Sequence, residues 1–193
     1  MKTTSIEQFY HFYPAVVNLV GARLGDKTNF MAAAWHSGVS HKPPLYLVSI
    51  APKRFTHDLI AESGEFTCNF LDIRHLKMIH GTGTLSGHDG DKVKQLNIPL
   101  ADSLEIACPI IASAYAAYEC RVVHQYPAGD HTLFVGEVVA AHCDEKLVLD
   151  DGLLDPTKID FALYLGSNNY LSADPDSRTY ISRELEITRL GRR

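Results

Sequence analysis

The sequence predicts a mainly β protein, a β-barrel with helices at its periphery. Short runs rich in β-branched and aromatic residues recur along the chain, and Gly, Pro, Asn and Asp separate them. Only a few short stretches have helical patterning. The 193 residues include 46% hydrophobic and 21% charged residues, a composition that fits one ordered domain over residues 1–193.

The first part of the chain is expected to alternate strands with turns. Tyr13–Leu24 is predicted as a strand, with Thr28–Ala34 as its hairpin partner after a turn at Gly25. Pro43-Pro44 then interrupts the sheet, because proline cannot donate to its hydrogen-bonding ladder. Leu45–Ile50 resumes it as a strand.

A short helix is expected next. Thr56 is predicted as its N-cap, Leu59 and Ile60 give it an apolar face, and Gly64 ends it in a left-handed conformation. The strand Phe66–Leu71 follows.

Two further helical pieces are expected, Ile73–Gly81 and Asp91–Leu96. The run GTGTLSGHDGDK between them is predicted as a long polar loop. Long polar loops in compact domains more often have a functional role than serve only as connections.

The second half is predicted to be richer in strands. Ile110–Val123 and Thr132–His142 form a hairpin around a turn at Pro127–Asp130. Lys146–Leu149 is expected to add a short strand. The tail, Tyr164–Arg193, ends in an apolar alternation, ISRELEITRL.

Charge and hydropathy argue against two classes of partner. The net charge is −5 and the basic residues form no long run, so a surface for a nucleic-acid backbone is missing. No segment approaches the roughly 20 apolar residues of a membrane-spanning helix. We therefore expect a soluble, cytoplasmic protein that binds neither nucleic acid nor membrane.

The cysteines are expected to be buried, reduced thiols. They form no CxxC pair, the spacing typical of zinc sites and thioredoxin-like redox centres, and free cysteine is among the most often buried residue types. No metal site is expected, and a redox role for one cysteine is the open alternative. The four residues are Cys68, Cys108, Cys120 and Cys143.

A run of small and aromatic residues, Asn29–Ser40, is the first candidate for a ligand site. The alanines Ala32–Ala34 let the backbone come close to a planar ligand, and Trp35, the only tryptophan, could supply an aromatic wall. Ser37 and Ser40 add hydroxyls. The alternative is an alanine-rich strand packed closely in the core, and composition alone does not choose between the two.

A basic cluster, Lys53 and Arg54 with Thr56, follows between a predicted strand and a predicted helix start. Cations, a hydroxyl and free N–H groups at a helix N-terminus can hold a phosphate, because the helix end carries about half a positive charge. The alternative is a solvated basic turn with an ordinary cap. The sequence has neither a nucleotide triphosphatase loop nor a dinucleotide-binding glycine pattern.

Two other places offer polar candidates. His131 puts an imidazole at a loop-to-strand junction, where it could bind a cofactor or transfer a proton. The loop around Ser86 and His88, with Asp91 and Lys92, offers a polar lid whose lysine could meet an anion. The plainer alternatives are a surface histidine and a solvated loop with a capping aspartate.

Taken together, these motifs resemble the flavin reductase-like family of FMN-binding split barrels, and within it the flavoredoxin-type branch. The resemblance extends from about Tyr13 to Tyr170 and rests on four segments in order: NFMAAAWHSGVSHKPPLYLVSI, KRFTHDLIAESGEFTCNF, DHTLFVGEV and YLGSNNY. It implies a six-stranded Greek-key split barrel with added helices. It also implies a homodimer that holds one FMN per subunit near the interface.

The resemblance assigns roles to single residues. Asn29–Trp35 and Ser40 would lie along the isoalloxazine ring and ribityl chain, and the basic cluster would meet the phosphate. Asn69 would lie nearby as a structural or cofactor-contacting residue, and Ser86 and Lys92 belong to the family's variable loop. His131 is the implied catalytic residue, near the flavin or the nicotinamide. The implied cofactor-binding residues are Asn29, Met31, Ala32, Ala33, Ala34, Trp35, Ser40, Lys53, Arg54, Thr56, Asn69, Ser86 and Lys92.

The sequence departs from the commonest family pattern at AAAW, where many members have a Thr-x-Ser-Ala type of stretch. The lost hydroxyls leave more of the flavin contact to backbone groups.

Three functions are consistent with this sequence. The first is an oxidoreductase that accepts hydride from NAD(P)H on FMN and passes electrons to a second acceptor. The second is a flavoredoxin-type carrier with tightly bound FMN that serves protein partners without direct nicotinamide oxidation. The third is a flavin-free binding module for another phosphorylated small molecule.

Overall fold

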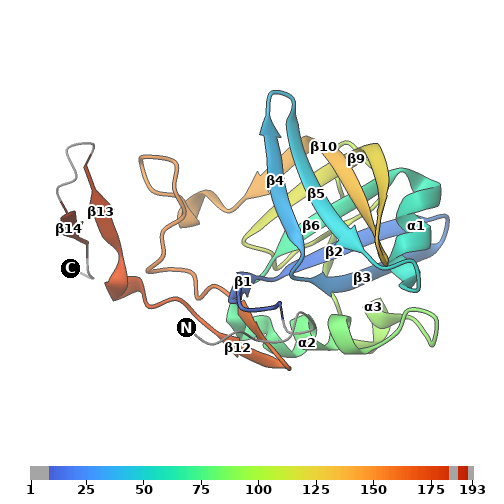
Figure 1. The fold of residues 1–193 in the computed structure, drawn as a ribbon, viewed down its shortest axis with the longest axis horizontal. Helices are drawn as coiled ribbons and strands as arrows, with labels where there is room; N and C mark the ends of the chain where they lie inside the picture. Colours follow the sequence, from blue (N-terminus) through green and yellow to red (C-terminus); the bar gives the residue numbers. More distant parts are fainter. Residues whose placement is uncertain (1–8, 183–186, 191–193) are drawn as a thin grey trace.

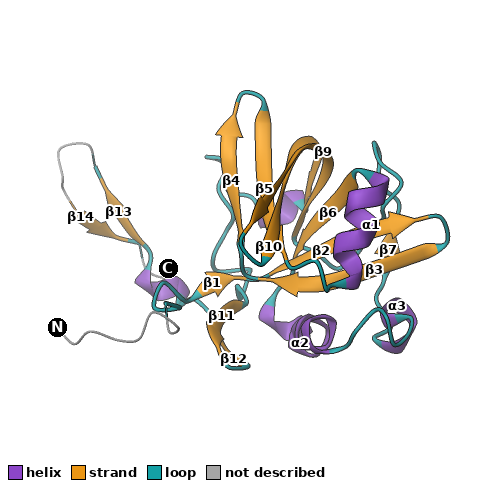
Figure 2. Ribbon diagram, turned by 45° about the vertical axis from the view of Figure 1, so that its right-hand side comes forward, coloured by secondary structure: helices purple, strands orange, loops and turns teal. Residues whose placement is uncertain are grey.

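The computed structural model describes residues 9–182 and 187–190. Its body is a curled, antiparallel seven-stranded sheet with the strand order β3-β2-β6-β9-β10-β5-β4, and the helices lie outside it (Figures 1 and 2). The expected class, mainly β with peripheral helices, is confirmed, with seven strands in place of six. The strands are β2 (Asn18–Leu24), β3 (Lys27–Ala33), β4 (His36–His41), β5 (Pro44–Ile50), β6 (Glu65–Phe70), β9 (Ala116–Ala128) and β10 (His131–Cys143).

The two edge strands of this sheet, β3 and β4, are consecutive in the sequence. Only Ala34 and Trp35 separate the end of β3 from the start of β4. The sheet therefore has to curl until these two edge strands meet at Ala34 and Trp35. The Ser49 N–H on β5 donates to the Trp35 carbonyl at 2.9 Å and fastens the junction. Beyond it the β4–β5 hairpin projects away from β3 (Figure 1). The barrel is therefore split, and the split opens beside Trp35.

Strand β4 was not expected from the sequence. Asn29–Ser40 is not one unit, because it contains both the end of β3 and most of β4. The proline pair does interrupt pairing, but as the turn of a hairpin: His41 pairs with Pro44, which begins β5. The first hairpin forms as expected between β2 and β3, and Gly25 supplies a left-handed residue, with φ of 56°, in its turn. The expected strand Tyr13–Leu24 is in fact two, because Ala15–Val16 forms a separate short strand in another sheet and β2 begins only at Asn18.

The long hairpin β9–β10 differs from expectation in its ends. Each strand has 13 residues, and only Gly129 and Asp130 lie between them, so the expected turn at Pro127–Asp130 is shorter. The expected strand Ile110–Val123 is in fact two. Its start, β8 (Ile110–Ile111), pairs with β7 (Leu100–Ala101) in a separate small sheet.

Helix α1 (Phe55–Ser63) ends as expected at Gly64, whose φ is 71° and whose N–H donates to the Ile60 carbonyl at 2.9 Å. Its expected N-cap is wrong. Arg54 occupies the N-cap position without a side-chain cap, and Thr56 lies buried inside the first turn. The Thr56 hydroxyl instead accepts a hydrogen bond from the Asn29 side chain, so it is turned toward β3.

The second expected helix consists of the 3-10 turn η2 (Ile73–His75) and α2 (Leu76–Thr84). Because α2 extends past Gly81, the expected polar loop is shorter. The third piece, α3 (Lys92–Gln95), begins after Asp91, whose carboxylate accepts the Lys94 N–H at 3.1 Å.

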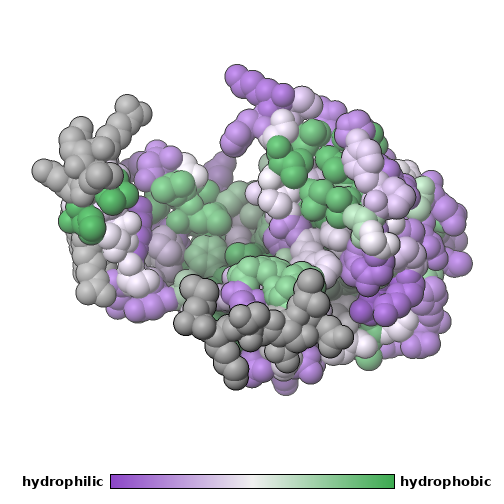
Figure 3. Space-filling model, viewed as in Figure 1, coloured by the Kyte–Doolittle hydropathy of each residue, from purple (hydrophilic) through white to green (hydrophobic). Residues whose placement is uncertain are grey.

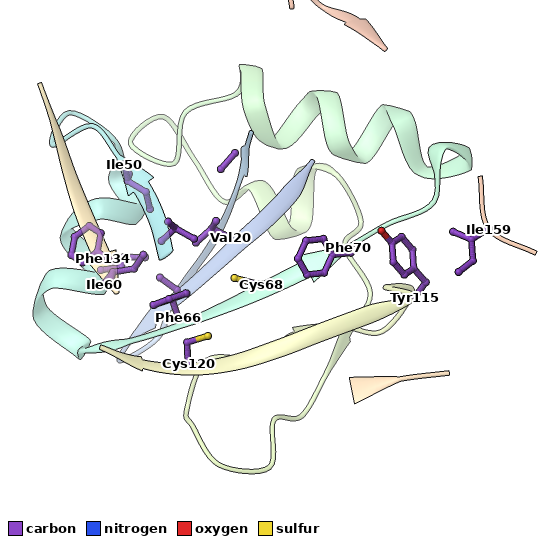
Figure 4. Packing of buried hydrophobic residues seen from close by; sticks show 14 residues of the cluster. Val20, Ile50, Ile60, Phe66, Cys68, Phe70, Tyr115, Cys120, Phe134 and Ile159 are labelled. Carbon is purple, nitrogen blue, oxygen red and sulfur yellow. The ribbon is translucent and has the colours of Figure 1, made fainter. Parts of the chain in front are cut away.

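The core has two parts because β2 and β3 are buried on both faces. Val20 faces the barrel interior and packs with Phe66, Phe134 and other apolar residues (Figure 4). Leu19 and Phe30 point the opposite way and join a cluster that includes residues of α2. Alternate residues of a strand face opposite sides, so these strands hold α2 against the barrel.

The last part of the chain returns to the barrel and then leaves it. Strands β1 (Ala15–Val16), β11 (Leu163–Gly166) and β12 (Asn169–Leu171) form a small sheet. The expected strand Lys146–Leu149 is wrong, because Glu145–Leu147 forms a 3-10 turn (η3) capped by Asp144. Near the end are η4 (Pro175–Ser177), β13 (Thr179–Ile181) and β14 (Ile187–Arg189). The expected apolar alternation falls partly on residues 183–186, outside the described residues.

Three of the four cysteines, Cys68, Cys108 and Cys120, are buried and free, as expected. Cys143 is exposed at the end of β10, so that part of the prediction is wrong. Within residues 9–182 and 187–190, no three His, Cys, Asp or Glu side chains gather as a metal site. In the same residues no helix has the length and apolar character to cross a membrane.

Candidate functional site

The split of the barrel opens into a groove along β3. Three adjoining cavities, of about 280, 90 and 160 Å³, all have Ala32 in their walls. We call them together the β3 groove. Trp35 and His131 line the cavity of 280 Å³. Lys92 lines the cavity of 90 Å³, and Tyr164 and Tyr170 line the cavity of 160 Å³.

Small residues keep the floor of this groove open. Ala32, Ala33 and Ala34 line it from the end of β3. A Cβ added at Gly83, on α2, would lie 3.3 Å from the Ala32 Cβ. Larger side chains on either element would therefore narrow the space between β3 and α2. The small side chains leave room for a flat ligand to approach the β3 backbone.

An aromatic wall stands at one end. The Trp35 ring lies 4.9 Å from the His131 ring, centroid to centroid, and its indole N–H donates to the Tyr13 hydroxyl at 3.2 Å. His131 Nδ1 lies 2.7 Å from an Asp130 carboxylate oxygen, and this hydrogen bond holds the pKa of Asp130 below its ordinary value. With Nδ1 engaged by Asp130, the other ring nitrogen is left for a ligand.

The other end of the groove is basic. Lys53, Arg54 and Lys92 line the same cavity, and in the described part of the chain none of the three lies within ion-pair distance of a carboxylate. Lys92 is only 3% exposed, and its ammonium donates to the Thr82 carbonyl at 2.9 Å. Burial, together with the positive charge of Arg54, lowers the pKa of Lys92 to about 8. A buried cation without a countercharge is costly, so this corner suits an anion.

Backbone groups add to this basic corner. The N-terminus of α1 has no side-chain cap at Arg54, so the N–H groups of Phe55 and Thr56, which have no intrahelical acceptor, are available to an anion, whereas the His57 N–H donates to the Arg54 carbonyl at 2.8 Å. The loop at Ser86 and Gly87 closes the cavity from the other side. A Cβ at Gly87 would lie 2.5 Å from the Phe55 ring, so only glycine lets this loop approach α1 so closely.

The structure brings most of the sequence-predicted residues together. Met31 lies between the aromatic and basic cavities. Asn29 and Thr56 line the basic cavity but satisfy each other, with Asn29 Nδ2 donating to the Thr56 hydroxyl at 2.7 Å. The predicted residues that line the groove are Asn29, Met31, Ala32, Ala33, Ala34, Trp35, Lys53, Arg54, Thr56, Ser86, Lys92 and His131.

Two predicted residues do not line it. Ser40 lies next to the turn of the β4–β5 hairpin, which carries it away from the split. Asn69 is fully buried in β6: its amide donates to the Leu19 carbonyl at 2.9 Å and its oxygen accepts the Ile111 N–H at 2.7 Å. Asn69 therefore links the barrel to β8, and its expected role as a cofactor contact stays a prediction.

Sequence reasoning missed several lining residues. Tyr164 and Tyr170 reach the groove because β11 pairs with β1, with Tyr164 opposite Ala15. His80 on α2 joins them, with Nδ1 lying 3.4 Å from the Tyr170 hydroxyl. The segment YLGSNNY contributed to the resemblance without any of its residues being assigned to the site. The segment reaches the groove through the long-range pairing of β11 with β1, which no local sequence pattern indicates.

Comparisons with known proteins agree with this geometry. The model of the flavin reductase like domain matches residues 9–158. An FMN-binding protein from Thermus thermophilus, solved with bound 1-cyclohex-2-enone, is 36% identical, with a TM-score of 0.80 over 89% of this chain and 93% of that one. Flavoredoxin from Methanosarcina acetivorans is 30% identical, with a TM-score of 0.80 over 90% of this chain and 92% of that one.

An NADH-dependent flavin reductase from a Rhodococcus species is 32% identical over 66% of this chain and 64% of that protein. The family model covers most of the chain, and both solved structures share its fold. The chain therefore belongs to the flavin reductase-like family.

Proposed function

We propose that the β3 groove holds FMN and that the protein is an oxidoreductase, which takes hydride from NAD(P)H and passes electrons to a second acceptor. The observation that best supports this is the set of three cations, Lys53, Arg54 and Lys92, in one cavity of a groove whose other walls include the alanines Ala32–Ala34 and the aromatic residues Trp35, Tyr164 and Tyr170. FMN has the matching form, a phosphate at one end and a planar ring system at the other.

The residues present fit this cofactor. The basic corner is narrow and partly closed by the loop at Ser86, as a terminal phosphate requires. The alanines Ala32–Ala34 leave the β3 backbone accessible to a flat ring, and Trp35 offers an aromatic face.

When bound, FMN supplies the redox chemistry of hydride acceptance and electron transfer. The protein's share is to bind, orient and shield. Arg54 and Lys92 hold the phosphate, and Trp35 with Tyr13 shields the aromatic end from water. His131, held by Asp130, offers its free ring nitrogen as a hydrogen-bond partner to the bound flavin or the nicotinamide.

The proposal includes a homodimer with FMN near the interface. Phe9 and Tyr10 stack at 4.9 Å and remain 55% and 48% exposed. Both rings lie against Trp35, with centroids at 6.0 and 6.5 Å, so they extend the aromatic wall of the groove toward solvent. Covering this aromatic edge with a second copy would bury apolar surface beside the cofactor.

A flavoredoxin-type carrier is the second candidate, supported by the likeness to the Methanosarcina flavoredoxin. In that case FMN stays bound and a protein partner reduces it. The Rhodococcus relative, by contrast, supports nicotinamide as the donor. The experiment described next also shows whether NADH or NADPH is the donor.

Anaerobic mixing of the FMN-loaded protein with NADH, and separately with NADPH, separates the two candidates. We expect at least one nicotinamide to bleach the flavin absorbance at a saturable rate. His131→Ala should slow this reduction by about tenfold or more and change FMN affinity by less than about twofold. His124→Ala, an exposed histidine on β9, is the matched control. No bleaching by either nicotinamide would favour the carrier, and unchanged kinetics would remove His131 from the site.

A further inference from the structure

One cavity of the β3 groove takes no part of FMN in the proposal above. The phosphate belongs in the cavity of 90 Å³, and the ring belongs beside Trp35 in the cavity of 280 Å³. The remaining cavity, of 160 Å³, lies between β3 and α2, and we call it the Tyr170 pocket. It shares Ala32–Ala34 and Tyr164 with the cavity beside Trp35, so a ligand in the Tyr170 pocket would lie next to the flavin ring.

The Tyr170 pocket has the size of a single six-membered ring. Its volume is about 160 Å³, and a cavity of about 150 Å³ is large enough to bind benzene. The Tyr164 and Tyr170 rings in its wall lie 5.2 Å apart, centroid to centroid, and Val17 adds an aliphatic side chain. Thr84 and Asn168, which also line it, are exposed, so a ligand can enter from solvent. The pocket therefore suits a small, flat ring.

The chemistry of the wall favours an uncharged ligand that accepts hydrogen bonds. None of the described residues that line the pocket is Lys, Arg, Asp or Glu, so a charged ring would find no counterion there. Burial raises the pKa of Tyr170, and the neighbouring Tyr164 adds to this. The Tyr170 hydroxyl therefore keeps its proton and can donate it to a ligand oxygen.

His80 connects this hydroxyl with the outer surface of α2. His80 Nδ1 lies 3.4 Å from the Tyr170 hydroxyl, and both residues also line an open depression on the other side of the helix, together with Lys77. Helix α2 lies along the lower edge of the molecule in Figure 1, and hydrophilic residues are visible along this edge in Figure 3. In the tautomer with the proton on Nδ1, His80 donates to the Tyr170 oxygen and leaves the Tyr170 O–H for a ligand. A proton can therefore pass from solvent through His80 and Tyr170 into the pocket.

We propose that the Tyr170 pocket binds a neutral, single-ring quinone, and that quinones of this class are the second electron acceptor. This inference rests on the proposed function, because the electrons come from the bound flavin. A quinone is flat and uncharged, its oxygens accept hydrogen bonds, and it takes up two electrons. These are the properties that the size, the uncharged wall and the Tyr170 hydroxyl of the pocket select.

The reaction balances without a further co-reactant. One oxygen of the quinone takes a hydride equivalent, which is two electrons and one proton, from the reduced flavin, and the flavin returns to its oxidised form. The other oxygen takes a proton from the Tyr170 hydroxyl, which is reprotonated through His80 from solvent. Both C=O groups become C–OH groups, and the product is the hydroquinone.

The first test measures binding, by equilibrium dialysis of the oxidised, FMN-loaded protein against tetramethyl-1,4-benzoquinone. This quinone has no free ring position, so it does not add to the exposed thiol of Cys143. Tyr170→Phe keeps the ring and removes the hydroxyl, and it should weaken the affinity by about three- to tenfold. Tyr126→Phe, the same change at an exposed tyrosine on β9, is the matched control and should change the affinity by less than about twofold.

The second test measures electron transfer after reduction of the flavin with dithionite, so that the nicotinamide step is not involved. The rate of re-oxidation by the same quinone is compared with the rate of re-oxidation by ferricyanide, an anion that takes single electrons without a proton. Tyr170→Phe should lower the ratio of the two rates by about tenfold or more. Tyr126→Phe should lower it by less than about twofold.

Each other result overturns a stated part. A Tyr170→Phe variant with the affinity and the rate ratio of the wild type removes Tyr170 from a quinone site. Competition between the quinone and FMN for the flavin-free protein would assign the pocket to the cofactor itself and overturn the acceptor site, while the proposed function would stand. A protein that does not retain FMN overturns the proposed function and the reduction step, and dialysis of the flavin-free protein then decides the quinone site by itself.

Discussion

Lys92 makes the phosphate site testable by pH. Its ammonium is almost fully buried at the basic end of the β3 groove, and its one hydrogen-bond acceptor in the described structure is the Thr82 carbonyl. Burial, with the nearby charge of Arg54, lowers its pKa to about 8. A bound phosphate dianion would stabilise the charged form and raise this pKa again. FMN binding should therefore take up a proton above pH 8.

The size of the effect follows from linkage. At pH 7 nearly all free protein has a charged Lys92, whereas at pH 9 only roughly one tenth does, given a pKa of about 8. If the bound form stays protonated, FMN affinity falls by about tenfold between pH 7 and pH 9, which corresponds to about 1.4 kcal/mol. Riboflavin has the same ring system but no phosphate, so its affinity should not show this fall.

The assay is fluorescence titration of the flavin-free protein with FMN and with riboflavin at a series of pH values. The ratio of the two affinities cancels the ionisation of the ring and of groups elsewhere in the protein. Lys92→Met keeps an unbranched apolar stem and removes the charge, so its ratio should be low and independent of pH. A wild-type ratio that stays flat from pH 7 to pH 9 would refute the assignment of Lys92 to the phosphate.

Three other substitutions probe separate parts of the account. Arg54→Ala should weaken FMN binding by about tenfold and leave riboflavin within about twofold in the same titration; equal losses would place the phosphate elsewhere. Asn69→Ala should lower the free energy of unfolding in urea by roughly 2–4 kcal/mol without changing FMN affinity, because it leaves buried groups such as the Ile111 N–H unpaired; a specific loss of FMN would make it a cofactor residue. Glu119→Gln should reduce the loss of unfolding free energy as the pH is lowered into the acid range. A loss as large as that of the wild type would disprove the contribution of Glu119 to acid stability.

The sign of the Glu119 effect follows from its surroundings. Burial alone would raise the pKa of Glu119, but hydrogen bonds from the backbone N–H groups of Leu104 and Glu105 and from His142 outweigh it and hold the pKa below its ordinary value of 4.5. A carboxylate with a depressed pKa stabilises the fold above its unfolded-state pKa. That stability is lost as the pH falls through the lower, folded-state value.

The sequence was sufficient for features with a local cause. Gly25 and Gly64 mark the turn and the helix end at which their positive φ angles occur, and the hydrophobic strands β3, β5 and β6 lie close to their predicted positions. The basic cluster and the alanine run also lie in one groove. Local patterns can indicate these features because they depend on neighbouring residues.

The errors have tertiary causes. Thr56 does not cap α1, because the buried amide of Asn29, 27 positions earlier, takes its hydroxyl. Ser40 belongs to a strand whose apolar pattern is weak, since β4 is an edge strand with mostly exposed side chains. Tyr164 and Tyr170 reach the groove only through the pairing of β11 with β1. None of these contacts can be derived from the adjacent sequence.

The most direct measurement of the central claim is the absorption spectrum of the purified protein after loading with FMN and gel filtration, followed by anaerobic addition of NADH or NADPH. The account predicts that about one FMN per chain stays with the protein and that at least one nicotinamide bleaches its visible absorbance. A protein that emerges without visible absorbance would contradict the flavin assignment of the β3 groove. Retained flavin that neither nicotinamide reduces would contradict the proposed oxidoreductase activity.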